Sequence, residues 1–185
     1  MLRQIMGLVL SHVYVVVLCG VFGLGAMWWV LDKPVWEAVF SVIASLIYFS
    51  AIYNKAWECA ARDRKPYTET SPYLFKGAVL SVGVLILNLI LWLCYKMAWA
   101  FLTIDGSLAT YTGVLYNVLY IFNTFMYTGF INLNQGAMSW YAHIIIYVVP
   151  VAAAVTGYIA GLHDFMLTEK LTPFIYEKRK STNKK

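Results

Sequence analysis

The chain has 185 residues, of which 61% are hydrophobic and only 12% are charged, with a formal net charge of +5. Charged residues make up about a quarter of an ordinary globular chain, so this sequence has too little polar surface to cover a water-exposed fold. The composition excludes a soluble enzyme, a nucleic-acid-binding module and a disordered regulator. It predicts a single integral membrane domain over residues 1–185, surrounded by the lipid bilayer.

Four stretches are long and apolar enough to cross a bilayer, which takes about 20 residues of α-helix. They cover residues 5–31, 35–53, 77–102 and 142–162. We therefore predict an all-α fold, a polytopic bundle of four transmembrane helices. The first stretch is too long for the core of a cleavable signal peptide, so we expect it to remain as a membrane anchor.

A fifth stretch, residues 111–131, is long enough to span the membrane but differs in character. It mixes many aromatic side chains with Asn117, Asn123 and several threonines. Such polar residues suit a re-entrant or interfacial element on the outer side, because irregular backbone is tolerated where protein or water covers it. The alternative is a fifth full crossing.

The basic residues predict the orientation, because Lys and Arg tend to stay on the cytoplasmic side. All of them except Lys33 and Lys96 precede the first span, lie in the predicted loop 54–76 or lie in the tail 163–185. Placing both termini in the cytoplasm keeps these cations inside and requires an even number of crossings. This favours four spans over five.

The two basic cytoplasmic segments differ in composition. In the loop, the neighbouring charges of Arg62, Asp63 and Arg64 are expected to pair with one another in solvent. The tail interleaves apolar residues with cations, a pattern that binds anionic lipid headgroups at about 1 kcal/mol per cation. A tail that only orients the protein would have the same composition, so both interpretations stay open.

Small residues at helical spacing predict where helices touch, because association in lipid depends on close packing rather than on the hydrophobic effect. The predicted packing residues are Gly20 and Gly23 on the first span and Ala153, Gly157 and Gly161 on the last. The stripe on the first span also includes His12, which is therefore expected to point at protein. The sequence does not say whether the partner helices belong to the same chain.

Polar side chains within or beside the spans are the candidate ligand groups. The candidates are Asn88, Asn117, Asn123 and His143. A structural role, in which each side chain bonds a neighbouring helix, is the competing interpretation and the favoured one for Asn88.

Metal binding and catalysis are not expected. The three histidines fall at different depths and the three cysteines form no CxxC pair, so the sequence predicts no metal, haem or other cofactor. Ser139 and His143 share a helix face, but no nucleophile elbow such as GxSxG surrounds the serine.

Scattered positions in the loop and the last span carry a resemblance. They are Trp57, Arg62, Asp63, Arg64, Tyr73, Lys76, Gly77, Gly157, Tyr158 and Gly161, followed by the basic tail. This pattern resembles uncharacterised small four-span membrane proteins of Gram-positive bacteria. The resemblance implies a multi-pass protein of the bacterial cell membrane and contributes no function.

The leading functional hypothesis is a non-enzymatic membrane protein that acts as a subunit or partner of a larger membrane assembly, with other membrane helices as its partners. The sequence predicts no buried carboxylate for ion coupling, no paired broken helices and no repeated halves, which transporters commonly have. The alternative is a small transporter or substrate-binding component for an uncharged polar solute. In that case Asn88, Asn117 and Asn123 would line an outward cleft.

Overall fold

The computed structural model of the protein describes residues 1–30, 33–65, 72–102, 125–127 and 140–165. The elements are α1 (Leu2–Val30), α2 (Pro34–Asp63), α3 (Lys76–Leu102), the 3₁₀ turn η1 (Phe125–Tyr127) and α6 (Trp140–Leu162). Four of these helices are long and apolar enough to cross a membrane. The predicted all-α, four-span fold is therefore confirmed.

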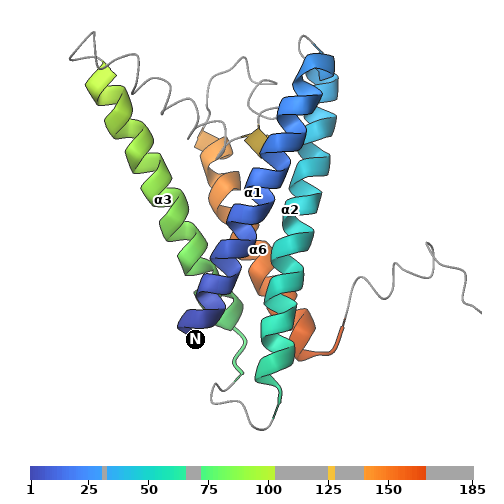
Figure 1. The fold of residues 1–185 in the computed structure, drawn as a ribbon. Helices are drawn as coiled ribbons and strands as arrows, with labels where there is room; N and C mark the ends of the chain where they lie inside the picture. The colour runs from blue at the N-terminus through green and yellow to red at the C-terminus, as the bar shows by residue number, and fades with distance from the viewer. Residues whose placement is uncertain (31–32, 66–71, 103–124, 128–139, 166–185) are drawn as a thin grey trace, which may run out of the picture.

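The four long helices alternate in direction (Figure 1). We name the end where α1 and α3 begin and α2 and α6 end the basal end, and the opposite end the apical end. The end of α3 and the start of α6 both lie at the apical end, as an even number of crossings requires. This arrangement favours the predicted four crossings over five.

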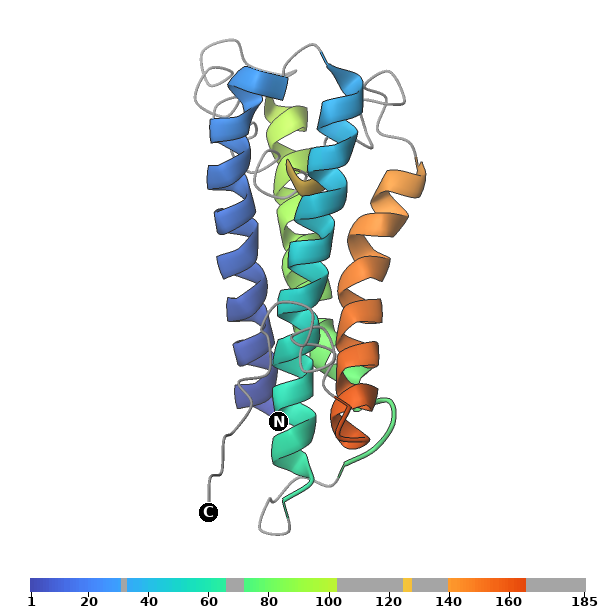
Figure 2. The ribbon, with the colours of Figure 1, turned by 90° about the vertical axis from the view of Figure 1, so that its right-hand side faces the viewer.

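The most extensive contact among the described elements joins α2 and α6, which lie side by side in Figure 2. Glycines make the close approach feasible. A Cβ built on Gly157 would lie 2.9 Å from Tyr53 Cα, and one on Gly161 would lie 2.7 Å from Trp57 O. The small-residue face of α6, which also includes the buried Ala153, thus packs against a helix of the same chain.

The second helix is longer than predicted. We expected the span to end at Tyr53 and a loop to begin at Asn54, but α2 continues to Asp63. The extension is stable because its inner side packs against α6, with Ala56 and Ala60 fully buried. The loop between α2 and α3 is accordingly shorter than the predicted segment 54–76.

The remaining helices pack around this pair. Gly20 and Gly23 are buried on α1, and Gly83 of α3 lies so close to α1 that a Cβ there would meet the Ile5 side chain at 2.5 Å. Large apolar side chains also cover the outside of all four long helices, as expected for helices surrounded by lipid.

One turn of the predicted outer segment lies inside the bundle. Met126 and Tyr127 of η1 are buried in the main hydrophobic core, in contact with α1 and α2. The rest of the segment 111–131 lies outside the described residues.

A capped turn ends α6 at the basal end. The backbone N–H of Phe165 donates to Ala160 O, and that of Asp164 donates to Gly161 O, which is the hydrogen-bond pattern of a Schellman motif. Asp164 takes the left-handed conformation, with φ of 55°. Its carboxylate pairs with Arg64, and the Trp57 indole donates to Phe165 O at 3.1 Å, so the turn is held against the foot of α2.

Candidate functional site

Four polar side chains meet at the basal end, one from each long helix. Gln4 lies in the first turn of α1, Asp63 ends α2, Lys76 begins α3 and Tyr158 lies near the end of α6. All four are buried, and the side chains of Lys76 and Asp63 are only 1% and 0% exposed. We name these four residues the basal cluster.

The Asp63 carboxylate lies at the centre of the basal cluster. Lys76 Nζ is 2.7 Å from Asp63 Oδ2, and the Tyr158 hydroxyl donates to the same oxygen at 2.8 Å. Gln4 Nε2 donates to Asp63 Oδ1 at 2.8 Å. Both carboxylate oxygens are therefore engaged, and the ammonium group balances their charge.

The basal cluster is balanced in charge but incomplete in hydrogen bonds. Within the described part of the chain, Gln4 Oε1 and Lys76 Nζ are buried and have no hydrogen-bond partner. The ammonium group lies close to the carboxylate, but off the direction that a hydrogen bond requires. A buried ion pair whose remaining polar atoms are unsatisfied offsets less of its desolvation cost than a complete network does.

Gly77 brings Lys76 into this position. A Cβ on Gly77 would lie 2.6 Å from Ala154 O and 2.9 Å from Tyr158 Cβ. Because the first turn of α3 rests directly on the backbone of α6, the adjacent lysine reaches the carboxylate at the end of α2. The sequence pair Lys76 and Gly77 thus places a cation beside the anion that α2 supplies.

A second polar group, which we name the central layer, consists of His12, Tyr48 and Asn88 from α1, α2 and α3. With a rise of about 1.5 Å per residue, His12 is about 12 Å along α1 from Gln4 and Asn88 is about 18 Å along α3 from Lys76. His12 Nδ1 and the Tyr48 hydroxyl are 2.8 Å apart and hydrogen-bonded, with their rings edge to face.

Asn88 completes the central layer. Its side chain is close enough to interact with His12, yet its Oδ1 is buried without a well-directed hydrogen bond to any described residue. On the apical side, Tyr127 of η1 lies beside Tyr48 and Cys19. The outer segment therefore reaches the central layer through η1.

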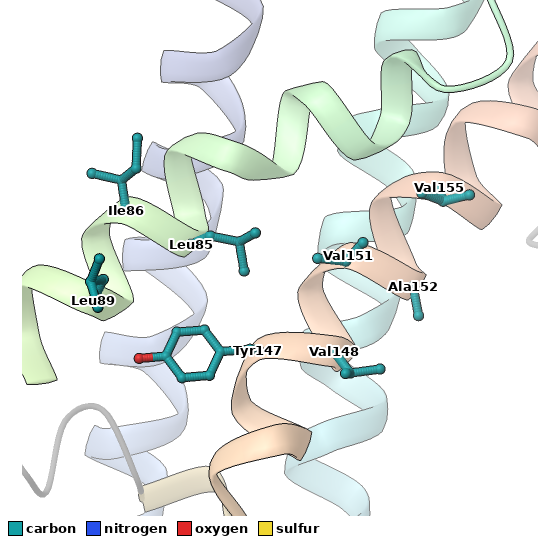
Figure 3. Close-up of a pocket in the computed structure, with 8 residues that line it drawn as sticks. All are labelled: Leu85, Ile86, Leu89, Tyr147, Val148, Val151, Ala152 and Val155. Carbon is teal, nitrogen blue, oxygen red and sulfur yellow. The ribbon is translucent and has the colours of Figure 1, made fainter.

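A third feature is an open groove of about 700 Å³ between α3 and α6. Figure 3 shows its lining, which is aliphatic except for one phenol, that of Tyr147. The lining residues are Leu85, Ile86, Leu89, Tyr147, Val148, Val151, Ala152 and Val155. The groove lies within the membrane-crossing parts of both helices, so it faces lipid.

The structure places the predicted ligand residues unevenly. Asn88 joins the central layer, as described above. His143 lies in α6, but its side chain is outside the described part of the structure, and Asn117 and Asn123 lie wholly outside it, as does Ser139. Of the four candidates, only the Asn88 side chain lies within the described part of the structure.

Two expectations about charge are wrong. Asp63 does not lie in a solvated loop, because α2 continues through it and its buried carboxylate pairs with Lys76 at the start of α3. The expected absence of buried carboxylates fails for the same reason. The usable signal was that Gln4 and Lys76 stand next to predicted span ends on one side of the membrane, with Asp63 in the predicted loop on that same side.

The chemistry that these groups support is binding and positioning. Among the described residues, no three His, Cys, Asp or Glu side chains gather as ligands for a metal ion. No protein-family model, curated protein or solved structure matches the chain. The features of the chain that bear on function are the basal cluster, the central layer and the groove.

Proposed function

We propose that this multi-pass membrane protein is non-enzymatic and acts as a subunit or partner of a larger membrane assembly. The observation that carries the proposal is the aliphatic groove between α3 and α6, which lies within the membrane. Helices in lipid associate through close side-chain packing, and a groove of this kind is an unfilled packing surface for a further transmembrane helix.

The packing of the two glycines of α6 also indicates the groove side of the molecule as the binding surface for a partner helix. Gly157 and Gly161 are occupied by α2, so that face of α6 is not open to a partner. Exposed apolar side chains continue the groove surface along α3. They are Ile86, Leu89, Ile90, Leu93 and Met97. A partner helix would therefore pack against α3 and the groove.

Site-specific photo-crosslinking in the native membrane tests the proposal. A photoreactive amino acid at Val148, in the groove, should give a discrete adduct with another membrane protein. The same amino acid at Leu10, on the exposed face of α1, is the matched control. Adducts that are absent at Val148, or equal at both positions, would contradict the proposal.

A second experiment fills the groove. Ala152→Trp places a large side chain in it, so co-purification of the partner in mild detergent should fall while the protein stays folded. Substituting Leu10 by Trp, on the exposed face of α1, should leave co-purification unchanged. If neither substitution affects a co-purifying subunit, that subunit binds elsewhere.

The charge distribution supports the orientation with the basal end in the cytoplasm of a bacterial cell. Arg3, Arg62, Arg64 and Lys65 all lie near the basal end, where the positive-inside rule places cations. Both termini are then cytoplasmic. The lysine-rich tail would bind anionic lipid headgroups of that leaflet.

A small transporter or substrate-binding component is the second candidate. The observation that favours it is the set of ionisable and amide side chains buried in the bundle, from the basal cluster to the central layer. Ionisable residues inside membrane bundles commonly mark solute or ion pathways. A small molecule retained by the isolated protein, without a co-purifying subunit, would favour this candidate over the first.

A further inference from the structure

The basal cluster and an apolar belt stand between the basal surface and the central layer. The belt consists of four side chains with 0% exposure, and they are Leu8, Ile52, Leu80 and Val84. The charged pair lies below the belt, and His12 and Asn88 lie above it along their helices. Anything that enters the bundle from the basal end has to pass both barriers.

One helix contributes to both barriers. Lys76, Leu80 and Val84 all belong to α3, and all are fully or almost fully buried. A movement of the basal half of α3 away from the bundle would therefore separate the ion pair and remove half of the belt in a single step. The groove beside α3 shows that its contact with α6 is already incomplete further along.

The surface that such a movement would uncover is polar and uncharged. Ser81 has 0% exposure and lies one heptad before Asn88, so both residues share a face of α3. Asn88 Oδ1 has an unfilled hydrogen-bonding position among the described residues. Amide and hydroxyl groups in a low-dielectric interior favour neutral hydrogen-bonding molecules over ions, because an ion would lose its hydration without a counter-charge.

We propose that the basal cluster is a gate. When the Asp63 and Lys76 pair is intact, it seals the basal end, and when the pair separates, water and small uncharged polar solutes reach Ser81 and Asn88. The incomplete hydrogen bonding of Lys76 Nζ and Gln4 Oε1 makes the closed state releasable. The gate does not depend on partner binding in the groove.

Cysteine labelling tests the gate. Cys19, Cys59 and Cys94 are first replaced by alanine, and Ser81→Cys then reports on access from the basal end. The probe is hydroxyethyl maleimide, which is small, polar and uncharged. With the native pair, labelling should be slow. With Asp63→Lys, which places two cations side by side, labelling should become more than about tenfold faster because a buried charge pair is broken.

Two controls separate gating from general loosening. Ala153→Cys, buried where α6 faces α2, should stay slow in both backgrounds. Combining Asp63→Lys with Lys76→Asp restores an ion pair and should return Ser81→Cys to slow labelling. Equal labelling of Ser81→Cys with and without Asp63→Lys, parallel gains at both reporters, or no recovery in the swapped pair would each overturn the proposal.

A variant that leaves the charges intact gives an independent test. Gly77→Ala inserts a methyl group against the backbone of α6 and should push the start of α3 outward, which speeds labelling of Ser81→Cys. Gly25→Ala, where a Cβ meets nothing within 4 Å, is the matched control and should have no effect. If Gly77→Ala leaves the labelling rate unchanged in a folded protein, the movement of α3 is not the gate.

Discussion

Lys76 and Asp63 illustrate how a buried charge depends on its partner. Each side chain is almost completely removed from solvent, so neither could remain ionised there without the other. Tyr158 and Gln4 add neutral hydrogen bonds to the carboxylate, but they cannot replace the cation. The contribution of Lys76 to stability is therefore conditional on Asp63.

This dependence predicts a non-additive pair of substitutions. Lys76→Met alone should lower the free energy of unfolding by about 3 to 5 kcal/mol, because it strands the Asp63 carboxylate. Adding Asp63→Asn to Lys76→Met removes the stranded charge and should recover most of the loss. Unfolding in detergent measures both, and a double variant as unstable as the sum of the single variants would contradict the coupling.

The central layer predicts a smaller effect. Tyr48→Phe removes the hydroxyl that bonds His12 Nδ1 at 2.8 Å and leaves the ring in place, so the imidazole loses one partner. Hydrogen bonds between membrane helices average about 0.6 kcal/mol, and an unsatisfied buried group costs about 1 to 3 kcal/mol. We expect a loss of about 1 kcal/mol. Tyr14→Phe, on an exposed part of α1, is the matched control.

At the scale of the elements, the close contact of α2 and α6 depends on glycine residues of α6, which have no side chain to hold the helices apart. Gly157→Ala should lower stability by about 1 to 3 kcal/mol, because its Cβ would meet the backbone of Tyr53, which cannot move aside as a flexible side chain can. Gly25→Ala has open space and should be neutral or slightly stabilising, since alanine favours the helix. Similar melting temperatures for the two variants would show that α2 and α6 are not packed closely.

The end of α6 predicts an effect of backbone conformation. Asp164 adopts a φ of 55°, which suits glycine better than a residue with a Cβ, but its carboxylate also pairs with Arg64 near the surface. Asp164→Gly and Asp164→Ala both lose the ion pair, and only the glycine relieves the backbone. The glycine variant should therefore be more stable than the alanine variant by about 1 kcal/mol in thermal or denaturant unfolding.

At the scale of the whole molecule, hydropathy predicted the four spans, and charge parity favoured four crossings over five. The end of α2 was missed because Lys55, Glu58 and Arg62 lower the hydropathy of a segment whose opposite side packs against α6. Amphipathic extensions of this kind are hard to separate from loops by composition alone.

The candidate site was harder to predict than the fold. Small residues indicated a contact face on α6, but spacing within one helix cannot name the helix that fills it. Asp63 and Lys76 are separated in sequence by a polar connection, which is typical of a solvated loop. Their pairing becomes visible only when the ends of all four helices meet, because each helix contributes a single member of the cluster.

The antiparallel arrangement limits the topologies that reporter fusions could find. A fusion after Lys185 and an insertion at residues 66–71 should both read cytoplasmic, and an insertion at Asp105 should read external. The structure requires the loop after α2 and the end of α6 to share one side, since both lie at the basal end. A complete inversion would refute only the orientation inferred from charge. Helix α3 has 27 residues with a single internal cation, so it is too apolar to remain on one side and is expected to cross. Cytoplasmic readings at both 66–71 and Asp105 would refute that crossing.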